Sequence, residues 1–543
     1  MLFNSSVFCY VFLPICILGY YLLARRGGVS AAKIWLCAAS FVFYAWWNPV
    51  FVVLLIGSIA FNYSLSVFLT GGDGDGDGDG DTAAGRRQSL LLAAGIAANL
   101  LLLFYFKYFA ALSRFLHDLG LTRADAGSIV LPLGISFFTF TQIGYLVDCR
   151  QGLVKERGLV NYVLFVTFFP HLIAGPILHH REIMPQFANP ATYRFKAENL
   201  AIGLALFAFG LFKKVALADS LSPWAELGFL HPEGTAFIQS WSVALAYSMQ
   251  LYFDFSGYSD MAIALGIMFG VKLPLNFNSP YKASSIIDFW QRWHMTLTRY
   301  LTLLIYNPVA LWVARRRQAK GQPSGQRAAA TASGFRSMIV FPIMVTMLLA
   351  GVWHGAGLQF FIFGALHGAY LCVNHAWRIF MPASSSTASS STASTASSSP
   401  RPPALLGRLW MRFWPVAVTY LAVLLAEIFF RARSAGDALA LLAGMTGANG
   451  IGVWPAFFTS NADALRLAHN LALGLGLAVI AFWAPNVYQI MGQWSPALTK
   501  VRSTLRPSWQ WQPTFAWAMA GGVLLFLASL RFDQKAVFLY FQF

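Results

Sequence analysis

Long apolar runs alternate with short polar connections along most of the chain. Many of these runs approach the roughly 20 residues that an α-helix needs to cross the hydrocarbon core of a bilayer. The pattern therefore predicts an all-α polytopic membrane protein with about 11–13 transmembrane or re-entrant helices. The clearest candidates lie at residues 7–23, 33–46, 50–69, 90–109, 130–147, 159–178, 200–217, 339–353, 358–373, 414–430, 471–483 and 515–530.

Composition and charge agree with insertion into a membrane. Of the 543 residues, 57% are hydrophobic and 11% are charged, whereas a soluble domain has about 25% charged residues. The net charge of +17 is spread over short connections, and Arg25, Arg26 and Lys33 follow the first apolar run. By the positive-inside rule this distribution places the N-terminus on the periplasmic side. Because the basic residues form no single face, the charge argues against nucleic acid as a partner.

Two low-complexity segments divide the sequence. Residues 71–88 contain a Gly-Asp repeat that we interpret as a flexible cytoplasmic loop, and residues 382–404 form a Ser/Thr/Pro-rich linker. They leave a membrane core over residues 1–381 and a C-terminal group of helices of the same fold over residues 405–543. We expect both low-complexity segments to be dispensable for chemistry.

Polar residues inside apolar runs are the first candidates for chemistry, because each is costly if it faces lipid. Tyr247, Gln250, Asp254 and Tyr258 share one face of a helix predicted over residues 246–266. Asp254 alone would cost about 2.5–3.5 kcal/mol against lipid, so we expect it to face the protein interior or a watery cavity. A structural polar network and a direct role in a channel are equally good interpretations.

A second candidate stretch covers residues 276–301 and begins with a polar cluster that includes Asn276. Ser285 and Asp288 predict a capped helix start. Asp288 can also pair with Arg292, which lies four residues later on the same helix face.

The same stretch carries His294 directly after Trp293. One histidine among aromatic and charged residues suits a cavity or an interface better than a lipid-facing surface. A structural histidine and a functional histidine are equally good interpretations at this position.

The third candidate stretch, residues 348–368, is apolar except for a histidine toward each end. Three glycines surround His354, which follows Trp353, so the backbone there can bend and approach other groups closely. An apolar setting disfavours the charged imidazolium, and a neutral imidazole beside a hydroxyl can act as a general base. His367 lies thirteen residues on and can equally be a packing histidine, so His354 is the preferred catalytic candidate.

Recognised motifs for other chemistries are missing from the sequence. There is no HExxH, GxSxG, P-loop or dinucleotide fingerprint, so we predict no metal and no bound cofactor. His179 and His180 lie near Glu182, but a loop that faces lipid headgroups explains this cluster equally well. Acid–base chemistry by histidine inside a membrane is the interpretation that remains.

Four motifs, taken in order, resemble the membrane-bound O-acyltransferase (MBOAT) superfamily. They are "FFPHLIAGPILHHREIMPQF", "YFDFSGYSDMAIALGIMFGVKLPLNFNSPY", "WQRWHMTLTRYL" and "GVWHGAG". The first two narrow the likeness to the branch that holds the alginate O-acetyltransferase membrane subunit and the D-alanyl transfer protein of teichoic acids. The likeness covers nearly the whole chain outside the linker.

The resemblance implies a ring of helices around a central funnel or tunnel, in which His354 and His294 match the two family histidines. It also implies an acyl thioester such as acetyl-CoA as donor, a polysaccharide as acceptor, a periplasmic acetyltransferase partner and a place in the bacterial inner membrane. His354 would accept the hydroxyl proton, while His294 or nearby donors steady the oxyanion. Residues expected to line or brace the channel are Asp254, Tyr258, Asn276, Asp288, Arg292, Trp293, Trp353 and His367.

Two other functions stay open at this point. A transporter or flippase of an exported lipid or polymer would use the histidines as proton relays and would work without an acyl donor. The lack of internal repeats counts modestly against it. A scaffold of an export complex would tolerate substitution of both histidines.

Overall fold

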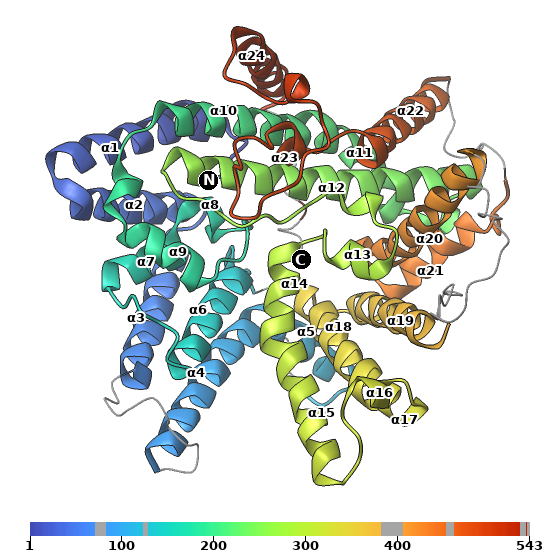
Figure 1. Cartoon of the computed structure of the whole chain (residues 1–543). Helices are drawn as coiled ribbons and strands as arrows, with labels where there is room; N and C mark the ends of the chain where they lie inside the picture. Colours follow the sequence, from blue (N-terminus) through green and yellow to red (C-terminus); the bar gives the residue numbers. More distant parts are fainter. Residues whose placement is uncertain are drawn as a thin grey trace, which may run out of the picture.

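Figure 1 shows the computed structural model of the chain, in which residues 1–70, 83–122, 127, 129–381, 405–451, 461–532 and 539 are described. These residues form helices and connecting loops with no β-strand among them, which confirms the all-α prediction. The predicted linker at 382–404 and residues 71–82 of the predicted loop lie outside the described residues. Residues 83–88 belong to helix α4.

The N-terminal part of the chain is a group of apolar helices that pack on their sequence neighbours. A π-helical turn (Phe8–Phe12) leads directly into α1, which gives one continuous helix over Phe8–Arg26. Pro14, which lacks an N–H group, directly follows the π-helical turn, where the α-helical hydrogen-bond pattern is already interrupted. The group comprises α1 (Leu13–Arg26), α2 (Gly28–Ala45), α3 (Val50–Thr70), α4 (Ala83–Lys107), α5 (Phe109–Asp118) and α6 (Ile135–Arg150).

The predicted span at 159–178 is wrong, because the helix breaks in its middle. Helix α7 (Leu159–Thr167) ends before Phe168, whose ψ of 104° is not helical, and Pro170 opens the short helix α8 (Phe169–Leu172). Proline is compatible with a helix start but not with a helix interior. The chain then runs as a loop to α9 (His180–Ala188).

Helix α12 (Phe237–Met268) is the central element of the fold. It is 32 residues long and buried along nearly its whole length, as expected for a helix that other helices surround. α10 (Ala197–Phe212) and α11 (Asp219–Leu230) pack along it, and Figure 1 shows α10 and α12 side by side. A π-helical segment (Lys213–Ala218) joins α10 to α11.

Most of the remaining helices lie below and to the right of α12 in Figure 1, whereas the last one, residues 515–529, packs against α10. Within this part α18 packs against α19, and α19 packs against α20. The elements are α13 (Ile286–Trp290), α14 (Met295–Leu301), α15 (Asn307–Ala319), α16 (Gln326–Ala329), α17 (Ala332–Gly334), α18 (Phe341–His354), α19 (Leu358–Phe380), α20 (Leu405–Arg431), α21 (Ala435–Met445), α22 (Asn461–Trp483), α23 (Val487–Ile490) and α24 (Phe515–Ser529).

Eight helices in the described part of the chain are long and apolar enough to cross a membrane. Each of them contains most of one predicted span, so eight of the twelve predictions are confirmed. Besides the broken span, the predictions at 130–147 and 515–530 correspond to the shorter helices α6 and α24, and 358–373 lies within α19. With 15 residues, α24 is about 22 Å long, less than the roughly 30 Å hydrocarbon core.

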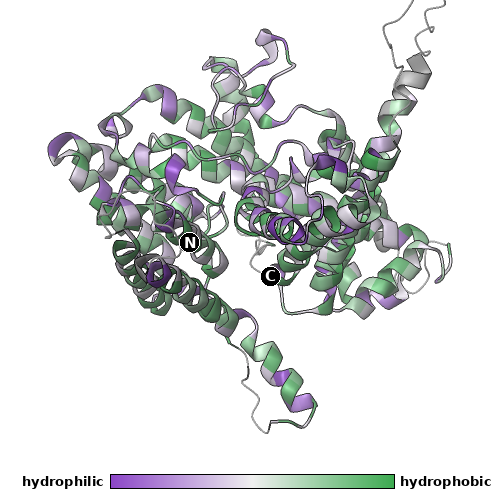
Figure 2. Ribbon diagram, turned by 60° about the horizontal axis from the view of Figure 1, so that its bottom comes forward, coloured by the Kyte–Doolittle hydropathy of each residue, from purple (hydrophilic) through white to green (hydrophobic). Residues whose placement is uncertain are grey.

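The outer surface of the long helices is apolar. Figure 2 shows hydrophobic residues along the peripheral helices and hydrophilic residues mainly at helix ends and in loops. Val53 in α3, Leu101 in α4 and Val373 in α19 are 73%, 66% and 67% exposed. Large apolar side chains exposed over whole helices are what a lipid environment requires. The chain is a multi-pass membrane protein.

Candidate active site

A small cavity lies where α12, α13, α14, α18, α19 and α20 meet. His294, His354 and His367 all line it, although they lie far apart in the sequence. Glu427 from α20 lines it as well, and most of the other lining residues are aromatic or aliphatic. We call this space the histidine cavity. It brings together the three histidines that the sequence put forward as candidates.

His354 is the last residue of α18. Its ring is buried at 7% exposure and lies between the rings of Trp353 and Phe430, with centroids 4.7 and 4.8 Å away. The helix ends here because Gly355 adopts an extended conformation. A Cβ at Gly355 would lie 2.2 Å from the ring of Phe360, so a larger residue would require that ring to move. The sharp helix end fixes the imidazole at the cavity wall.

The carbonyl groups at the end of α18 are held by α4 and the residue after it. Lys107 Nζ donates a hydrogen bond to the Trp353 carbonyl, and Tyr108 Oη donates one to the Val352 carbonyl over 2.7 Å. The ammonium group also lies 5.4 Å from the centroid of the Trp353 ring. The last carbonyls of a helix have no partner within it, so these two donors stabilise the backbone that carries His354.

His294 is held in a backbone conformation that is uncommon for residues other than glycine. Its φ is 43° and its ψ 51°, in the left-handed region directly before α14. Asn276 fixes it twice: Asn276 Oδ1 lies 3.1 Å from His294 Nδ1, and the Asn276 carbonyl accepts from Met295 N over 2.9 Å. Because an amide oxygen only accepts, Nδ1 carries the proton in this contact. A neutral His294 ring then has its lone pair on Nε2.

His367 and Trp290 contribute two further polar groups to the wall of the histidine cavity. Their rings meet edge to face with centroids 5.1 Å apart. His367 Nδ1 and Trp290 Nε1 are both buried, with no hydrogen-bond partner among the described residues. Indole Nε1 is a donor only, so Trp290 offers a buried N–H group to a molecule in the cavity.

Glu427 is a residue that the sequence analysis missed. It is buried at 3% exposure, accepts a hydrogen bond from Tyr281 Oη over 3.1 Å, and has its Oε2 atom buried without a hydrogen-bond partner in the described part of the chain. The signal was present, since Glu427 is an acidic residue within the predicted span 414–430. An intramembrane acid is expected to serve a function or a specific pair.

Two predicted channel residues lie elsewhere. Asp254 is buried and faces the protein interior as predicted, where Lys214 Nζ bridges it to Asp219 at 2.6 Å to each carboxylate. Tyr258 packs its ring on Phe3 with centroids 4.7 Å apart. Neither residue lines the histidine cavity. These positions agree with the interpretation of this helix face as a structural polar network rather than as part of a channel.

Of the remaining predicted residues, Asp288, Arg292 and Trp353 do not line the histidine cavity. The predicted capped helix start is confirmed, since Ser285 Oγ accepts from Asp288 N, and the predicted pair is present with Arg292 Nε donating to Asp288 Oδ1 over 2.7 Å. Trp293 lines the cavity. Trp353 lies behind His354 and stacks on Phe140 with centroids 5.2 Å apart.

Comparison with known proteins gives one consistent family. The model of the MBOAT, membrane-bound O-acyltransferase family, matches residues 98–324, which include His294 but not His354. The chain is 37% identical to the peptidoglycan O-acetyltransferase of Helicobacter pylori, over 83% of this chain and 81% of that protein. It is 32% identical to the probable alginate O-acetylase of Pseudomonas putida, over the full length of both.

A third relative is less similar in sequence. The teichoic acid D-alanyltransferase of Bacillus subtilis is 28% identical over 46% of this chain and 60% of that protein. The family model and the two long alignments agree with the helical membrane fold. The chain belongs to the membrane-bound O-acyltransferase family.

Proposed function

We propose that this acyltransferase moves an acetyl or other short acyl group from a cytoplasmic thioester, such as acetyl-CoA, toward hydroxyl groups of an exported polysaccharide. The relatives named above as O-acetyltransferases of peptidoglycan and alginate support this acceptor class. Transfer is direct or passes through a periplasmic acetyltransferase partner. The observation that carries the proposal is the convergence of His294 and His354 on one cavity.

In the proposed reaction, His354 is the general base. The acceptor oxygen attacks the thioester carbonyl carbon while His354 takes the hydroxyl proton, and the C–S bond breaks as the ester forms. The proton then passes to the departing thiolate, which leaves as a thiol. The apolar surroundings of His354 keep water away from the thioester and favour transfer over hydrolysis.

The position of the proton on the His294 ring argues against oxyanion stabilisation by this residue. With Nδ1–H directed to Asn276, a neutral ring offers an acceptor at Nε2 rather than a donor. We therefore assign His294 to orient the attacking hydroxyl by accepting a hydrogen bond. The Nε1–H group of Trp290 is the better candidate to stabilise the oxyanion, because it is a buried donor on the same cavity wall.

The proposed location is the bacterial inner membrane with the N-terminus in the periplasm. Arg25 and Arg26 end α1, and Lys33 lies in the second helix. Basic residues in this short connection favour its retention on the cytoplasmic side. That orientation is testable with a reporter fused after Arg26.

The proposed base is tested by His354→Ala and His354→Gln. We expect each substitution to lower acyl transfer about 10²–10⁴-fold, because a positioned general base contributes that much. Ester-linked acetyl on envelope polysaccharide would be measured in cells, and acetyl-CoA turnover with purified protein.

The matched control is His375→Ala, which removes a histidine of α19 that does not line the cavity. We expect it to keep normal transfer and normal membrane insertion. Full activity of the His354 variants would remove the proposed base. Substrate flux across proteoliposomes without any acyl donor would favour the transporter.

A further inference from the structure

A second, larger cavity lies on the other side of α14 from the histidine cavity. His294 and Leu297 line the first cavity, whereas Thr296, Arg299 and Tyr300 line the second. We call it the Asp148 cavity. It receives Asp148 from the last turn of α6, together with His179 and His180 from the start of α9.

The structure corrects the sequence interpretation of this cluster. Glu182 was the acid expected beside His179 and His180, but its two carboxylate oxygens pair with Arg299 at 2.6 and 2.9 Å. Asp148, from a different helix, takes that place. The spacing along the sequence therefore gave no metal motif, although the fold brings a complete group of three ligand residues together.

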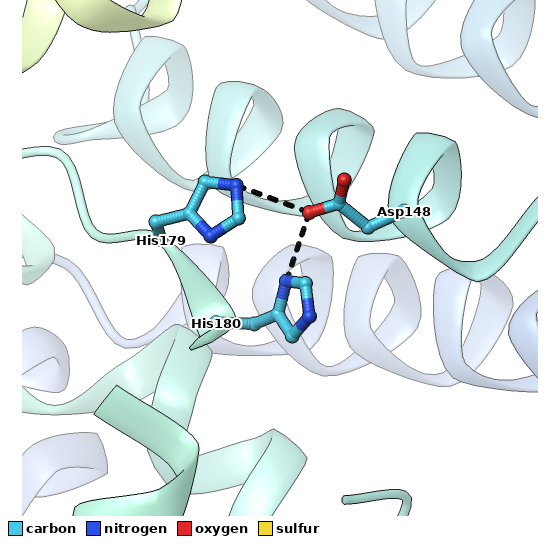
Figure 3. Close-up of side chains that lie close together, drawn as sticks. All are labelled: Asp148, His179 and His180. Atoms are coloured by element: carbon cyan, nitrogen blue, oxygen red, sulfur yellow. Dashed lines mark ion pairs between the residues drawn. The ribbon is translucent and has the colours of Figure 1, made fainter. Parts of the chain in front are cut away.

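The three side chains converge on one point, as Figure 3 shows. His179 Nε2 lies 3.1 Å and His180 Nδ1 lies 3.0 Å from the same Asp148 Oδ2 atom. The three potential ligand atoms all lie within 4.8 Å of one another. Ligand atoms around one tetrahedral zinc ion are about 3.4 Å apart, because Zn–N and Zn–O bonds are about 2.0–2.2 Å. Small rotations of the imidazoles therefore bring the three atoms to bonding distance of one ion.

The cluster is largely buried, and His179 is its most exposed member. The side chains of His180 and Asp148 are 5% and 11% exposed. Asp148 Oδ2 is buried, and both imidazoles form ion pairs with this one oxygen atom. His180 Nε2 is buried with no hydrogen-bond partner among the described residues. Three potential ligand atoms are thus gathered at one largely buried point, as in a metal site.

We propose that Asp148, His179 and His180 bind one divalent transition-metal ion of the Zn²⁺ type. Two imidazole nitrogens and one carboxylate oxygen suit Zn²⁺, whereas Mg²⁺ and Ca²⁺ prefer oxygen ligands throughout. Among the described residues this is the one group of three or more such side chains with metal-ligand spacing. The ion joins the end of α6 to the start of α9, which are separated by the broken helix.

Three protein ligands leave one tetrahedral position open, as in zinc sites that take a water or a substrate oxygen. All three ligands line the Asp148 cavity, and so do Arg181 and Arg299. The open position therefore accepts an oxygen ligand from that cavity. This inference concerns metal binding and does not depend on the assignment of His354 as the base.

The test is the metal content of the full-length protein purified in detergent. After incubation with Zn²⁺ and removal of excess metal, we expect about one equivalent per chain by mass spectrometry of the metal. Asp148→Asn and His180→Ala should lose most of this zinc. The Co²⁺ form of the wild type should show the intense visible absorption of tetrahedral cobalt, which both variants should lack.

The matched controls are Glu182→Gln and His117→Ala, which alter an acid and a histidine outside the cluster. Both should keep the zinc of the wild type. Because a variant can lose metal by misfolding, monodispersity is checked for each, and the cobalt spectrum of the wild type gives a readout that needs no variant. A wild-type protein without stoichiometric zinc and without the tetrahedral cobalt spectrum would overturn the proposal.

Discussion

At the scale of single residues, the histidine cavity shows how few polar atoms a buried site needs. Three histidines, one acid and the indole N–H of Trp290 are set among apolar side chains. Asn276 holds His294, and Tyr281 donates a hydrogen bond to Glu427. In so apolar a space an unsatisfied donor or acceptor is costly. Hydrogen bonds from these groups to the charge that develops in the transition state therefore stabilise it strongly.

Trp290→Phe is the sharpest single-residue test of oxyanion stabilisation. It removes one buried N–H donor and keeps an aromatic ring, so we expect kcat to fall about 10²–10³-fold with little change in KM. Trp241→Phe is the control, because its Nε1 donates to the Met445 carbonyl outside the cavity. Unchanged kcat in Trp290→Phe would rule out this donor.

At the scale of elements, the close packing of α18 and α19 positions two of the three histidines. A Cβ at Gly351 would lie 2.3 Å from the Phe360 carbonyl oxygen, and one at Gly364 would lie 2.3 Å from the Met347 carbonyl oxygen. The two helices therefore approach through glycine backbones, as membrane helices with small interface residues do. This approach brings His354 at the end of α18 and His367 in α19 to one cavity.

Gly351→Ala tests that contact. The added methyl group must push α18 and α19 apart, because the atom it meets belongs to the backbone. We expect a loss of about 1–3 kcal/mol in stability and a clear loss of acyl transfer. Thermal unfolding in detergent and acetyl-CoA turnover would measure the two effects.

Gly57→Ala serves as the control for the helical glycine itself. Gly57 lies in α3, and a Cβ there meets no atom within 4 Å. We expect normal activity and equal or slightly higher stability. Equal behaviour of the two alanine variants would contradict a structural role of the α18–α19 approach.

At the scale of the whole molecule, the histidine cavity is assembled from both sides of the 382–404 segment. The histidines precede this segment, whereas Val423, Glu427 and Phe430 of α20 follow it. Helix α20 also contacts α12 and α19. The C-terminal helices are thus part of the site and not an independent unit.

A truncated chain tests this arrangement. A protein that ends at Met381 should insert in the membrane but lose acyl transfer, because one wall of the cavity is missing. Replacing residues 384–400 with a Gly/Ser sequence of equal length should retain activity, since the native segment is itself of low complexity. Activity of the truncated chain would contradict the assignment of α20 to the site.

Much of the architecture could be predicted from the sequence because hydrophobicity acts locally. An apolar run of sufficient length becomes a membrane helix wherever it stands, and eight predicted spans are confirmed in this way. Local rules also gave the Ser285 cap and the Asp288–Arg292 pair. The break within the predicted span at 159–178 was missed because the hydropathy of this segment is continuous. Pro170 nevertheless separates α7 from a new short helix.

The sequence by itself determined that the chain lies in a membrane, which family it resembles and which histidines are unusual for their surroundings. Only the tertiary structure decided which polar groups meet: Glu427 with the histidines, Lys214 with Asp254, and Asp148 with His179 and His180. The physical reason is that the free-energy cost of placing a residue in the membrane depends on that residue and its neighbours in sequence. Which polar side chains pair depends instead on the packing of helices that are far apart in the sequence.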